Sequence, residues 1–352
     1  MTNYKVGNYR DVPVYRDFEN AANDHVLVVG RSGCGKTVCC QNIIRQIAEG
    51  GGRVLIIDMH GSLSDDQIFE PYRESFNKYR HDIDAAVGGI PCRLFTPLVT
   101  PKGNLEDPLD TAGAVADIFT RAAKLSLRKS SVMRKACEAV MESGAYSSEG
   151  IAAIGEALIK QDSRDSTDLY ELLHHIFRRN ALIDGESLFS EGINILHLSE
   201  FDLGTQAFLA EIILSYIWRM AVANQFKERN LYLFLDEAQN FNHDEKSPLA
   251  QAISEGRRMG VNLILATQMV LQGTTNSVQQ RLTQCGLILY GQPAANRVNL
   301  TAKNISVSNA DNYSLILQGL RVGEFIATGN YRIGVKPITY PIKISCREDV
   351  DD

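Results

Sequence analysis

The residues best suited to chemistry form a glycine-rich loop between an apolar strand and a helix. The loop and the residue after it are Gly30, Arg31, Ser32, Gly33, Cys34, Gly35, Lys36, Thr37 and Val38. The first eight fit the pattern G-x-x-x-x-G-K-[ST], in which glycines let backbone N–H groups converge on phosphate oxygens. Lys36 would reach the β- and γ-phosphates of a nucleotide, and Thr37 would offer its hydroxyl to Mg²⁺. The alternative is a glycine-rich turn that only joins a strand to a helix.

A second group of candidates follows the apolar segment Leu231–Leu235. Asp236 and Glu237 come directly after it, so both carboxylates are expected at the carboxyl end of a buried strand, where α/β sheets bind ligands. Asp236 would hold Mg²⁺ through water, and Glu237 would act as the general base on the attacking water. An ordinary exposed turn after a strand is the alternative.

Three further side chains are candidates for contact with the γ-phosphate or the attacking water. Gln268 ends the apolar run that begins at Val261, and it could report hydrolysis; a simple polar strand cap is the alternative. Arg257 precedes that run, and Arg297 follows the next one. Arginine suits a finger that reaches a phosphate in a neighbouring subunit, although a surface salt bridge would explain either residue.

The elements that must position these residues alternate between strands and helices. The pattern predicts a strand at His25–Val29, a helix at Lys36–Glu49 and a strand at Val54–Ile57, which together form a βαβ unit of a parallel sheet. Further strands are predicted at Ile193–Leu198, Leu231–Leu235, Val261–Ala266 and Leu287–Tyr290, with helices at Gly204–Asn224 and Pro248–Met259. The expected fold is α/β, a P-loop NTPase with a mostly parallel sheet and a helical insertion.

The same pattern divides the chain into segments. We expect an N-terminal arm or short hairpin at 1–24, a core made of 25–61 and 191–345, and an acidic tail at 346–352. Residues 62–190 lack apolar strand patterns and are predicted to be a mostly helical insertion. Within it, Leu105–Gly144 is one long stretch with helical spacing.

Composition narrows the class of protein. The chain has 352 residues with 44% hydrophobic and 22% charged residues, which is typical of globular proteins and excludes wholesale disorder. Its seven cysteines form no CxxC pair, so reduced thiols in a cytoplasmic protein are expected. Neither a signal peptide nor an apolar run of membrane-spanning length is apparent.

The formal net charge of −6 gives no global basic surface for nucleic acid. One local segment differs, because 121–135 contains six basic residues and no acid. Arg121, Lys124, Arg128 and Lys135 fall at helical spacing on one expected face. This face is a candidate DNA contact, with a solvated helix face as the alternative.

These motifs in this order resemble the HerA/FtsK superfamily of ring-forming, DNA-pumping ATPases, and its HerA branch most closely. The specific blocks are Asp236-Glu237-Ala238-Gln239-Asn240-Phe241 and Glu255-Gly256-Arg257-Arg258-Met259-Gly260, with Ala266-Thr267-Gln268 after them. The resemblance implies a hexameric ring that hydrolyses ATP with Mg²⁺ between subunits and moves duplex DNA. It also implies that Arg257 matches the family's arginine ahead of the sensor strand, and that Arg297 lies where relatives place trans-acting residues.

Only about 24 residues precede the first predicted core strand, whereas HerA proteins usually carry a small β-barrel there. The expectation is a stripped motor core that serves a separate nuclease or antiphage-defence effector. Two alternatives stay open: a secretion or conjugation motor at a membrane, and a nucleotide-dependent scaffold that assembles an effector enzyme.

Overall fold

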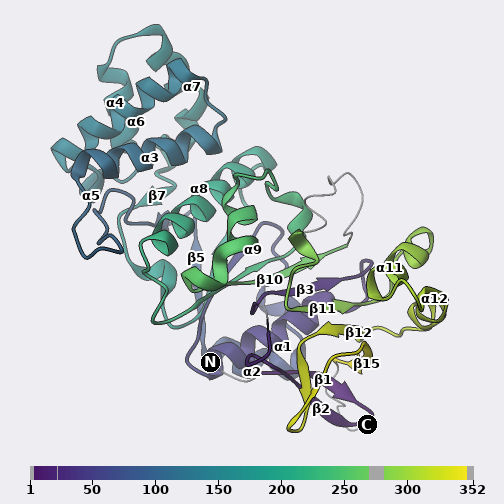
Figure 1. Ribbon diagram of the computed structural model, residues 1–352. Helices are drawn as coiled ribbons and strands as arrows, with labels where there is room; N and C mark the ends of the chain where they lie inside the picture. The colour runs from purple at the N-terminus through teal and green to yellow at the C-terminus, as the bar shows by residue number, and fades with distance from the viewer. Residues whose placement is uncertain (1–3, 22, 269–280, 347–352) are drawn as a thin grey trace.

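The computed structural model describes residues 4–21, 23–268 and 281–346, and its centre is one large sheet (Figure 1). Within the described residues the strand order is β14-β13-β2-β1-β15-β12-β11-β3-β10-β9-β4-β8-β5. The strands are β1 (Lys5–Tyr9), β2 (Val12–Arg16), β3 (Val26–Val29), β4 (Arg53–Asp58), β5 (Arg80–Asp84), β8 (Gly192–His197), β9 (Leu231–Leu235), β10 (Val261–Thr267), β11 (Leu287–Tyr290), β12 (Glu324–Gly329), β13 (Tyr331–Ile333), β14 (Lys336–Ile338) and β15 (Ile342–Ser345). The short strands β6 (Ile90–Pro91) and β7 (Leu182–Ile183) pair separately.

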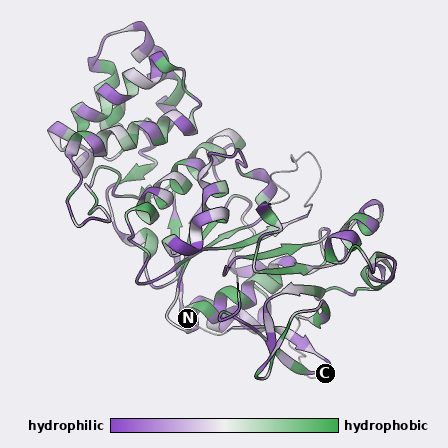
Figure 2. Cartoon of the chain, in the orientation of Figure 1, coloured by the Kyte–Doolittle hydropathy of each residue, from purple (hydrophilic) through white to green (hydrophobic). Residues whose placement is uncertain are grey.

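The strands from β11 to β5 run parallel to one another, and β3 lies between β10 and β11. All residues of β3, β9 and β10 are buried, which explains why their sequences are almost entirely apolar rather than alternating. Figure 2 shows these central strands as hydrophobic. The prediction of an α/β P-loop fold with a mostly parallel sheet and a helical insertion is confirmed.

Helices cover both faces of the parallel part. The main helices are α1 (Lys36–Glu49), α2 (Glu70–Lys78), α8 (Leu203–Val222) and α9 (Pro248–Met259). Because successive strand residues point to opposite faces, Val26 and Val28 pack in one core with Ile43 of α1, while Leu27 packs in the other with Ile212 of α8. The parallel strands are therefore packed on both faces, which holds them in place in the middle of the molecule.

The N-terminal residues lie within the main sheet. Strands β1 and β2 form an antiparallel hairpin, and β1 also pairs with β15. The side chain of Arg16 is fully buried and donates to the backbone oxygens of Asn23, Gly286 and Asn330. The predicted arm or hairpin is therefore a hairpin, and it extends the sheet on its antiparallel side.

Five helices of the segment predicted as an insertion project away from the sheet (Figure 1). They are α3 (Pro108–Ala122), α4 (Leu127–Ser143), α5 (Tyr146–Glu149), α6 (Ala152–Lys160) and α7 (Arg164–Arg179). The single long helical stretch predicted over Leu105–Gly144 is wrong, because the chain leaves the helix after Ala122. Lys124 has a positive φ of 50°, a conformation that no helix interior accepts, so α3 and α4 fold back on each other.

The expectation that sheet structure stops at residue 62 also needs correction. β5 pairs with β8 in parallel and forms the edge of the main sheet. Its sequence, Arg-His-Asp-Ile-Asp, is mostly polar and half-exposed, so it has none of the apolar continuity that marks the inner strands. Among the residues described, every helix is too short or too polar to cross a lipid bilayer.

Two helices follow β11 on the other side of the molecule, α11 (Val298–Ile305) and α12 (Ala310–Gln318). Short 3₁₀ turns, η3 (Ala238–Asn240) and η4 (Ala295–Arg297), follow the ends of β9 and β11. Both turns therefore leave the same carboxyl edge of the parallel strands.

Candidate functional site

The glycine-rich loop joins the end of β3 to the start of α1. Gly33 and Gly35 have φ values of 76° and 97°, which are conformations that favour glycine. A Cβ on Gly35 would also lie 3.0 Å from the backbone nitrogen of Gly323, and one on Gly30 would lie 2.5 Å from Sγ of Cys34. Glycine is thus favoured at position 30 by close packing, and at position 35 by both close packing and the backbone conformation.

The first turn of α1 is suited to an anion. No side chain of the described residues caps it, and its first turn contains no acidic residue, so its N–H groups and partial positive charge remain available for phosphate oxygens. Lys36 is buried, with its Nζ 3.4 Å from the backbone oxygen of Arg31. Ser32 and Gly33 are exposed at the tip of the loop, Thr37 and Val38 are half-buried, and Cys34 packs beneath the loop.

Asp236 and Glu237 lie at the carboxyl end of β9, two strands from the loop. Asp236 accepts a hydrogen bond from the backbone N–H of Glu237 at 2.9 Å. Burial raises the pKa of Asp236, and the lysine charge of Lys36 and a hydrogen bond from Ser62 oppose that increase. The positive charge of Lys36 therefore interacts favourably with the Asp236 carboxylate.

Asp58, at the end of the neighbouring strand β4, organises the loop that carries Ser62. Its carboxylate is buried and accepts from the backbone N–H groups of His60, Ser62 and Leu63. Such bonds fold the loop back over the strand end. A hydroxyl four residues after an acidic strand end is a weak signal, so the sequence alone does not single out Ser62.

Glu237 stands at the centre of a network of amide side chains. Its backbone is left-handed, with a φ of 48°. Gln268 Nε2 donates to one carboxylate oxygen at 2.7 Å, and Gln239 Nε2 donates to the other at 2.6 Å. Thr267 Oγ1 donates to Gln239 Oε1 at 2.6 Å. The structure thus brings Glu237 and Gln268 together, as expected from their strand ends, and adds Gln239 and Thr267.

The two arginines lie at opposite ends of the parallel strands, Arg297 at the carboxyl ends and Arg257 at the amino ends. Arg297 lines a small cavity of about 30 Å³ together with Gly30 and Gln268. Arg257 precedes β10 near its amino end, where its guanidinium donates to the backbone oxygen of Ala21 at 2.9 Å. A seven-residue strand spans about 23 Å, so Arg257 is distant from the phosphate loop of its own chain.

The four basic candidates do not share one helix face, and that expectation is wrong. Arg121 ends α3, Lys124 lies in the turn, and Arg128 and Lys135 lie on α4; all four are exposed. The physical reason is the break between α3 and α4, which helical periodicity does not reveal.

Arg121 and Lys124 lie close to the segment that follows Glu237. They line a pocket of about 310 Å³ with Glu211, Asn240 and Asn242, and Arg121 donates to the backbone oxygen of Lys246 at 3.4 Å. Burial raises the pKa of Glu211, against the opposing charge of Arg121. The helical segment therefore contacts the residues that follow Glu237 directly.

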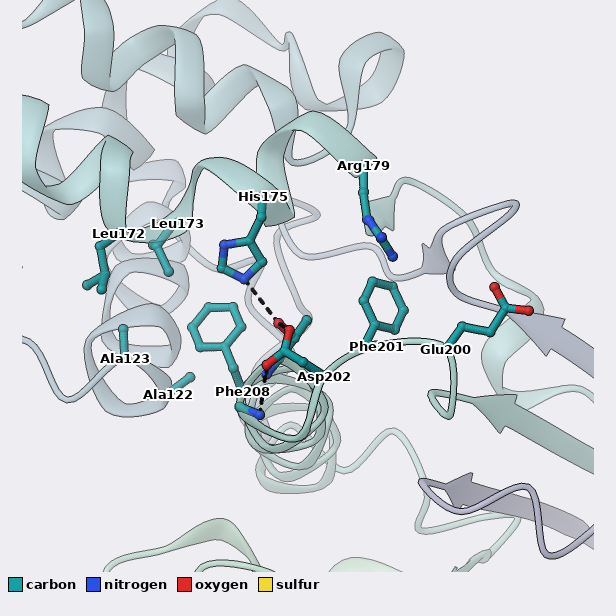
Figure 3. A pocket seen from close by; sticks show the side chains of 12 residues that line it. Ala122, Ala123, Leu172, Leu173, His175, Arg179, Glu200, Phe201, Asp202 and Phe208 are labelled. Atoms are coloured by element: carbon teal, nitrogen blue, oxygen red, sulfur yellow. Dashed lines mark hydrogen bonds between the residues drawn. The ribbon is translucent and has the colours of Figure 1, made fainter.

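A neighbouring pocket of about 490 Å³ lies between α7 and the start of α8 (Figure 3). His175 faces Thr205 at 3.1 Å, and Asp202 accepts from the Thr205 hydroxyl at 2.6 Å. Hydrogen bonds from the Thr205 hydroxyl and from the backbone N–H groups of Thr205 and Gly204 hold the pKa of Asp202 below its usual value. Arg179 lies over the ring of Phe201. These contacts tie the insertion to the core.

Comparison with known families decides the class of this chain. A family model described as "Helicase HerA, central domain" matches residues 4–217. The chain belongs to the HerA central-domain family. Its fold and strand-end motifs are those of a P-loop ATPase, as the resemblance predicted. No curated protein sequence matches the chain significantly.

Solved structures share the fold of this HerA-family chain at low sequence identity. VirB4 of Thermoanaerobacter pseudethanolicus has a TM-score of 0.68 and 16% identity, and the match covers 98% of this chain and 96% of VirB4. The bacterial conjugative coupling protein TrwB has a TM-score of 0.61 and 15% identity, covering 97% and 89%. TrwB has been solved in complex with ADP and Mg²⁺, with the same identity and coverage.

A magnesium site in this family member would draw few ligands from the protein. No group of three or more His, Cys, Asp or Glu side chains able to hold a metal occurs in the part of the chain that the structure describes. Mg²⁺ characteristically takes one or two protein oxygens and fills its other positions with water and phosphate oxygens. Thr37 at the start of α1 and Asp236 at the end of β9 suit that requirement.

Proposed function

We propose that this HerA-family chain binds and hydrolyses ATP with Mg²⁺ at the carboxyl edge of its sheet. The observation that carries the proposal is the meeting of three strand ends: the phosphate loop after β3, Asp236 and Glu237 after β9, and Gln268 after β10. The 2.7 Å bond between Gln268 and Glu237 supports a shared role for these two side chains. TrwB, which has a similar fold, binds ADP and Mg²⁺.

The phosphate loop would receive the triphosphate. Backbone N–H groups of residues 31–38 and the start of α1 would bind its β-phosphate, with Lys36 on the β- and γ-phosphates. Thr37, and Asp236 through water, would hold Mg²⁺, which supplies charge neutralisation on the phosphate oxygens when it is bound. The glycine conformations and the absence of a capping side chain among the described residues support this fit.

Glu237 would act as the general base. Its carboxylate would take a proton from the attacking water as the new bond to the γ-phosphorus forms and the bond to the β–γ bridging oxygen breaks, releasing ADP. Gln268 is exposed at the strand end and could contact the γ-phosphate or the water. Arg297, beside Gly30 and Gln268, would add positive charge from the same chain.

We further propose that the chain works as a ring, by analogy with the hexamers of the superfamily it resembles, and translocates duplex DNA. Arg257 is the candidate for a residue acting in a neighbouring subunit. The exposed basic residues Arg121, Lys124, Arg128 and Lys135 are the candidates for phosphate contacts. A separate nuclease or antiphage-defence effector would use the motor.

A second candidate is a conjugation-type motor, and the likeness to TrwB, a bacterial conjugative coupling protein, favours it. In that case DNA or protein would be moved at a membrane with partners that this chain does not include. The two candidates predict different behaviour of the isolated chain.

The test is ATP hydrolysis with and without linear duplex DNA at low and moderate salt. Turnover that DNA stimulates, that falls with salt and that disappears in Lys36→Ala supports the DNA motor. Turnover that is indifferent to DNA supports the conjugation-type motor or a scaffold instead. Hydrolysis unaffected by Lys36→Ala would overturn the assignment of the site.

A further inference from the structure

Two side chains beside the proposed catalytic base have no role in the function above. Gln239 lies in the turn η3 after β9, and Thr267 is the last residue of β10. The Thr267 hydroxyl is 2.6 Å from the Gln239 amide oxygen, and the Gln239 amide nitrogen is 2.6 Å from Oε2 of Glu237. A chain of side-chain hydrogen bonds therefore runs from one strand end to the carboxylate on the next.

The chemistry of the groups determines which group donates and which accepts in each of these hydrogen bonds. A carboxylate only accepts hydrogen bonds, so the Gln239 amide must present its NH₂ group to Glu237. Its amide oxygen then faces Thr267, whose hydroxyl must donate. The opposite orientation would place the amide oxygen against a carboxylate oxygen, which is repulsive. The Glu237 carboxylate thus sets the orientation of the Gln239 amide, and the Thr267 hydroxyl holds the amide in that orientation by donating to its oxygen.

The two amides that hold Glu237 differ in their surroundings. Gln268 is exposed and lines the same cavity as Gly30 and Arg297, so a bound γ-phosphate would compete for its amide. Gln239 is half-buried and held from behind by Thr267, which is buried. If Gln268 turned to a phosphate, Oε1 of Glu237 would be left to accept the proton of water, while Gln239 would still hold Oε2.

Thr267 also connects this series of hydrogen bonds to the phosphate loop. Its backbone oxygen accepts from the N–H of Gly30 at 3.2 Å, and it pairs in register with Val29, the residue before the loop. One residue therefore contacts the start of the phosphate loop through its backbone and sets the amide on the base through its side chain. Thr267 therefore links the start of the phosphate loop to the side chain that holds Glu237.

We propose that Gln239 is the positioning residue that holds the Glu237 carboxylate for hydrolysis, and that the Thr267 hydroxyl orients its amide. This inference rests on the proposed role of Glu237 as general base. Gln239 itself takes no proton and touches no substrate. Its loss should slow the chemical step without weakening nucleotide binding, because the phosphate loop is untouched.

The test uses four variants. Two are substitutions at Thr267, and two replace a glutamine with alanine. Thr267→Val keeps the shape of the side chain and removes the donor, whereas Thr267→Ser keeps the donor. Gln225→Ala is the control for Gln239→Ala, since Gln225 is exposed in the turn after α8. Steady-state hydrolysis gives kcat and KM, and titration with a fluorescent ADP analogue gives nucleotide affinity independently of activity.

A hydrogen bond to a charged group predicts a fall in kcat of about 10- to 100-fold in Gln239→Ala, with KM and ADP-analogue affinity within about twofold of wild type. Thr267→Val should lower kcat about fivefold, and Thr267→Ser should stay within about twofold of wild type, as should Gln225→Ala.

An unchanged kcat in Gln239→Ala overturns the inference, as does an equal fall in Thr267→Ser and Thr267→Val. A loss of nucleotide affinity equal to the loss of kcat also overturns it, because that result indicates a general disturbance of the site. Glu237→Gln separates this failure from failure of the proposed function. If Glu237→Gln retains full turnover, the base assignment fails and the positioning role fails with it.

Discussion

Replacing Glu237 with glutamine tests the proposed base with little change in shape. In the wild type both carboxylate oxygens accept amide donors, from Gln239 at 2.6 Å and from Gln268 at 2.7 Å. A glutamine at 237 has one acceptor oxygen and one NH₂ group, so one of the two amides must lose its bond. Gln268 is exposed and its amide can bond to water instead, so that loss is worth about 1 kcal/mol, or a fall in Tm of roughly 2 °C for a chain of this size.

The effect on catalysis should be far larger than the effect on stability. An amide cannot take a proton from water, and a positioned general base contributes about 10²- to 10⁴-fold in rate, which is roughly 2.7–5.5 kcal/mol of activation free energy. Lys36, Thr37 and the loop glycines are unaffected, so ATP affinity should stay within about twofold. Phosphate release measures kcat, and a fluorescent nucleotide measures affinity.

Glu255→Gln is the matched control, because it makes the same chemical change on α9, in an exposed ion pair with Arg258. It should hydrolyse ATP like the wild type. A kcat for Glu237→Gln within tenfold of wild type would refute the reasoning, and so would a loss of nucleotide binding that accounts for the whole decrease.

Three other predictions concern the loop, the insertion and the buried acid of α8. Gly35→Ala forces an L-residue to a φ of 97°, at a cost of about 1–2 kcal/mol before its contact with the backbone is counted, so fluorescent-nucleotide affinity should fall about tenfold or more. The double change Arg121→Ala and Lys124→Ala should lower the salt slope of duplex binding by about 1.8 if both contact phosphates, whereas Arg134→Ala, which removes an ion pair with an acid on α3, should leave it unchanged. The raised pKa of Glu211 means that its charge costs stability above the folded-state pKa and that this cost disappears as the pH falls below the unfolded-state value. Glu211→Gln should therefore raise Tm at about pH 8, with a difference that closes toward about pH 4; an equal difference at both values would contradict the argument.

The parts of the fold that were predictable from sequence are those with strong local signals. The strand β9 is a continuous apolar run and β10 is nearly one. The predicted helix Pro248–Met259 matches α9 at both ends. It begins at Ser247, whose side chain accepts from the Ala250 N–H, and ends at Gly260 in a left-handed conformation. Capping residues and buried strands determine their own structure over a few residues, so no long-range information is needed.

The features that the sequence alone does not predict depend on partners distant in sequence. β5 is a strand because β8 is beside it, since its own residues are polar. The hairpin β1–β2 joins the sheet through β15, more than 300 residues away. The turn at Lys124 interrupts residues that all favour a helix, and it is stabilised by the packing of α3 on α4. Local periodicity carries none of these contacts.

The candidate site shows the same division. The phosphate loop and the acids at 236 and 237 could be named from pattern alone, because their chemistry requires fixed residue types at fixed spacing. Gln239 and Thr267 could not be assigned roles, because their hydrogen bonds link two strands through side chains 28 residues apart. The hydrogen-bond partners of a glutamine two positions after an acidic pair cannot be inferred until the position of the adjacent strand is known.

The sequence offered the same role for Arg257 and Arg297, as an arginine that contacts a phosphate. Their positions in the structure distinguish them. Arg297 lies beside Gly30 and Gln268 of its own chain, so a neighbouring subunit is not required to bring it to the phosphate loop. Arg257 lies near the opposite edge of the sheet, about one full strand length away, and cannot reach that loop without unfolding α9 from β10. If the ring requires an arginine from a neighbour, Arg257 is therefore the one of the two that could supply it. That role would require the amino ends of the parallel strands in one subunit to face the nucleotide site of the next.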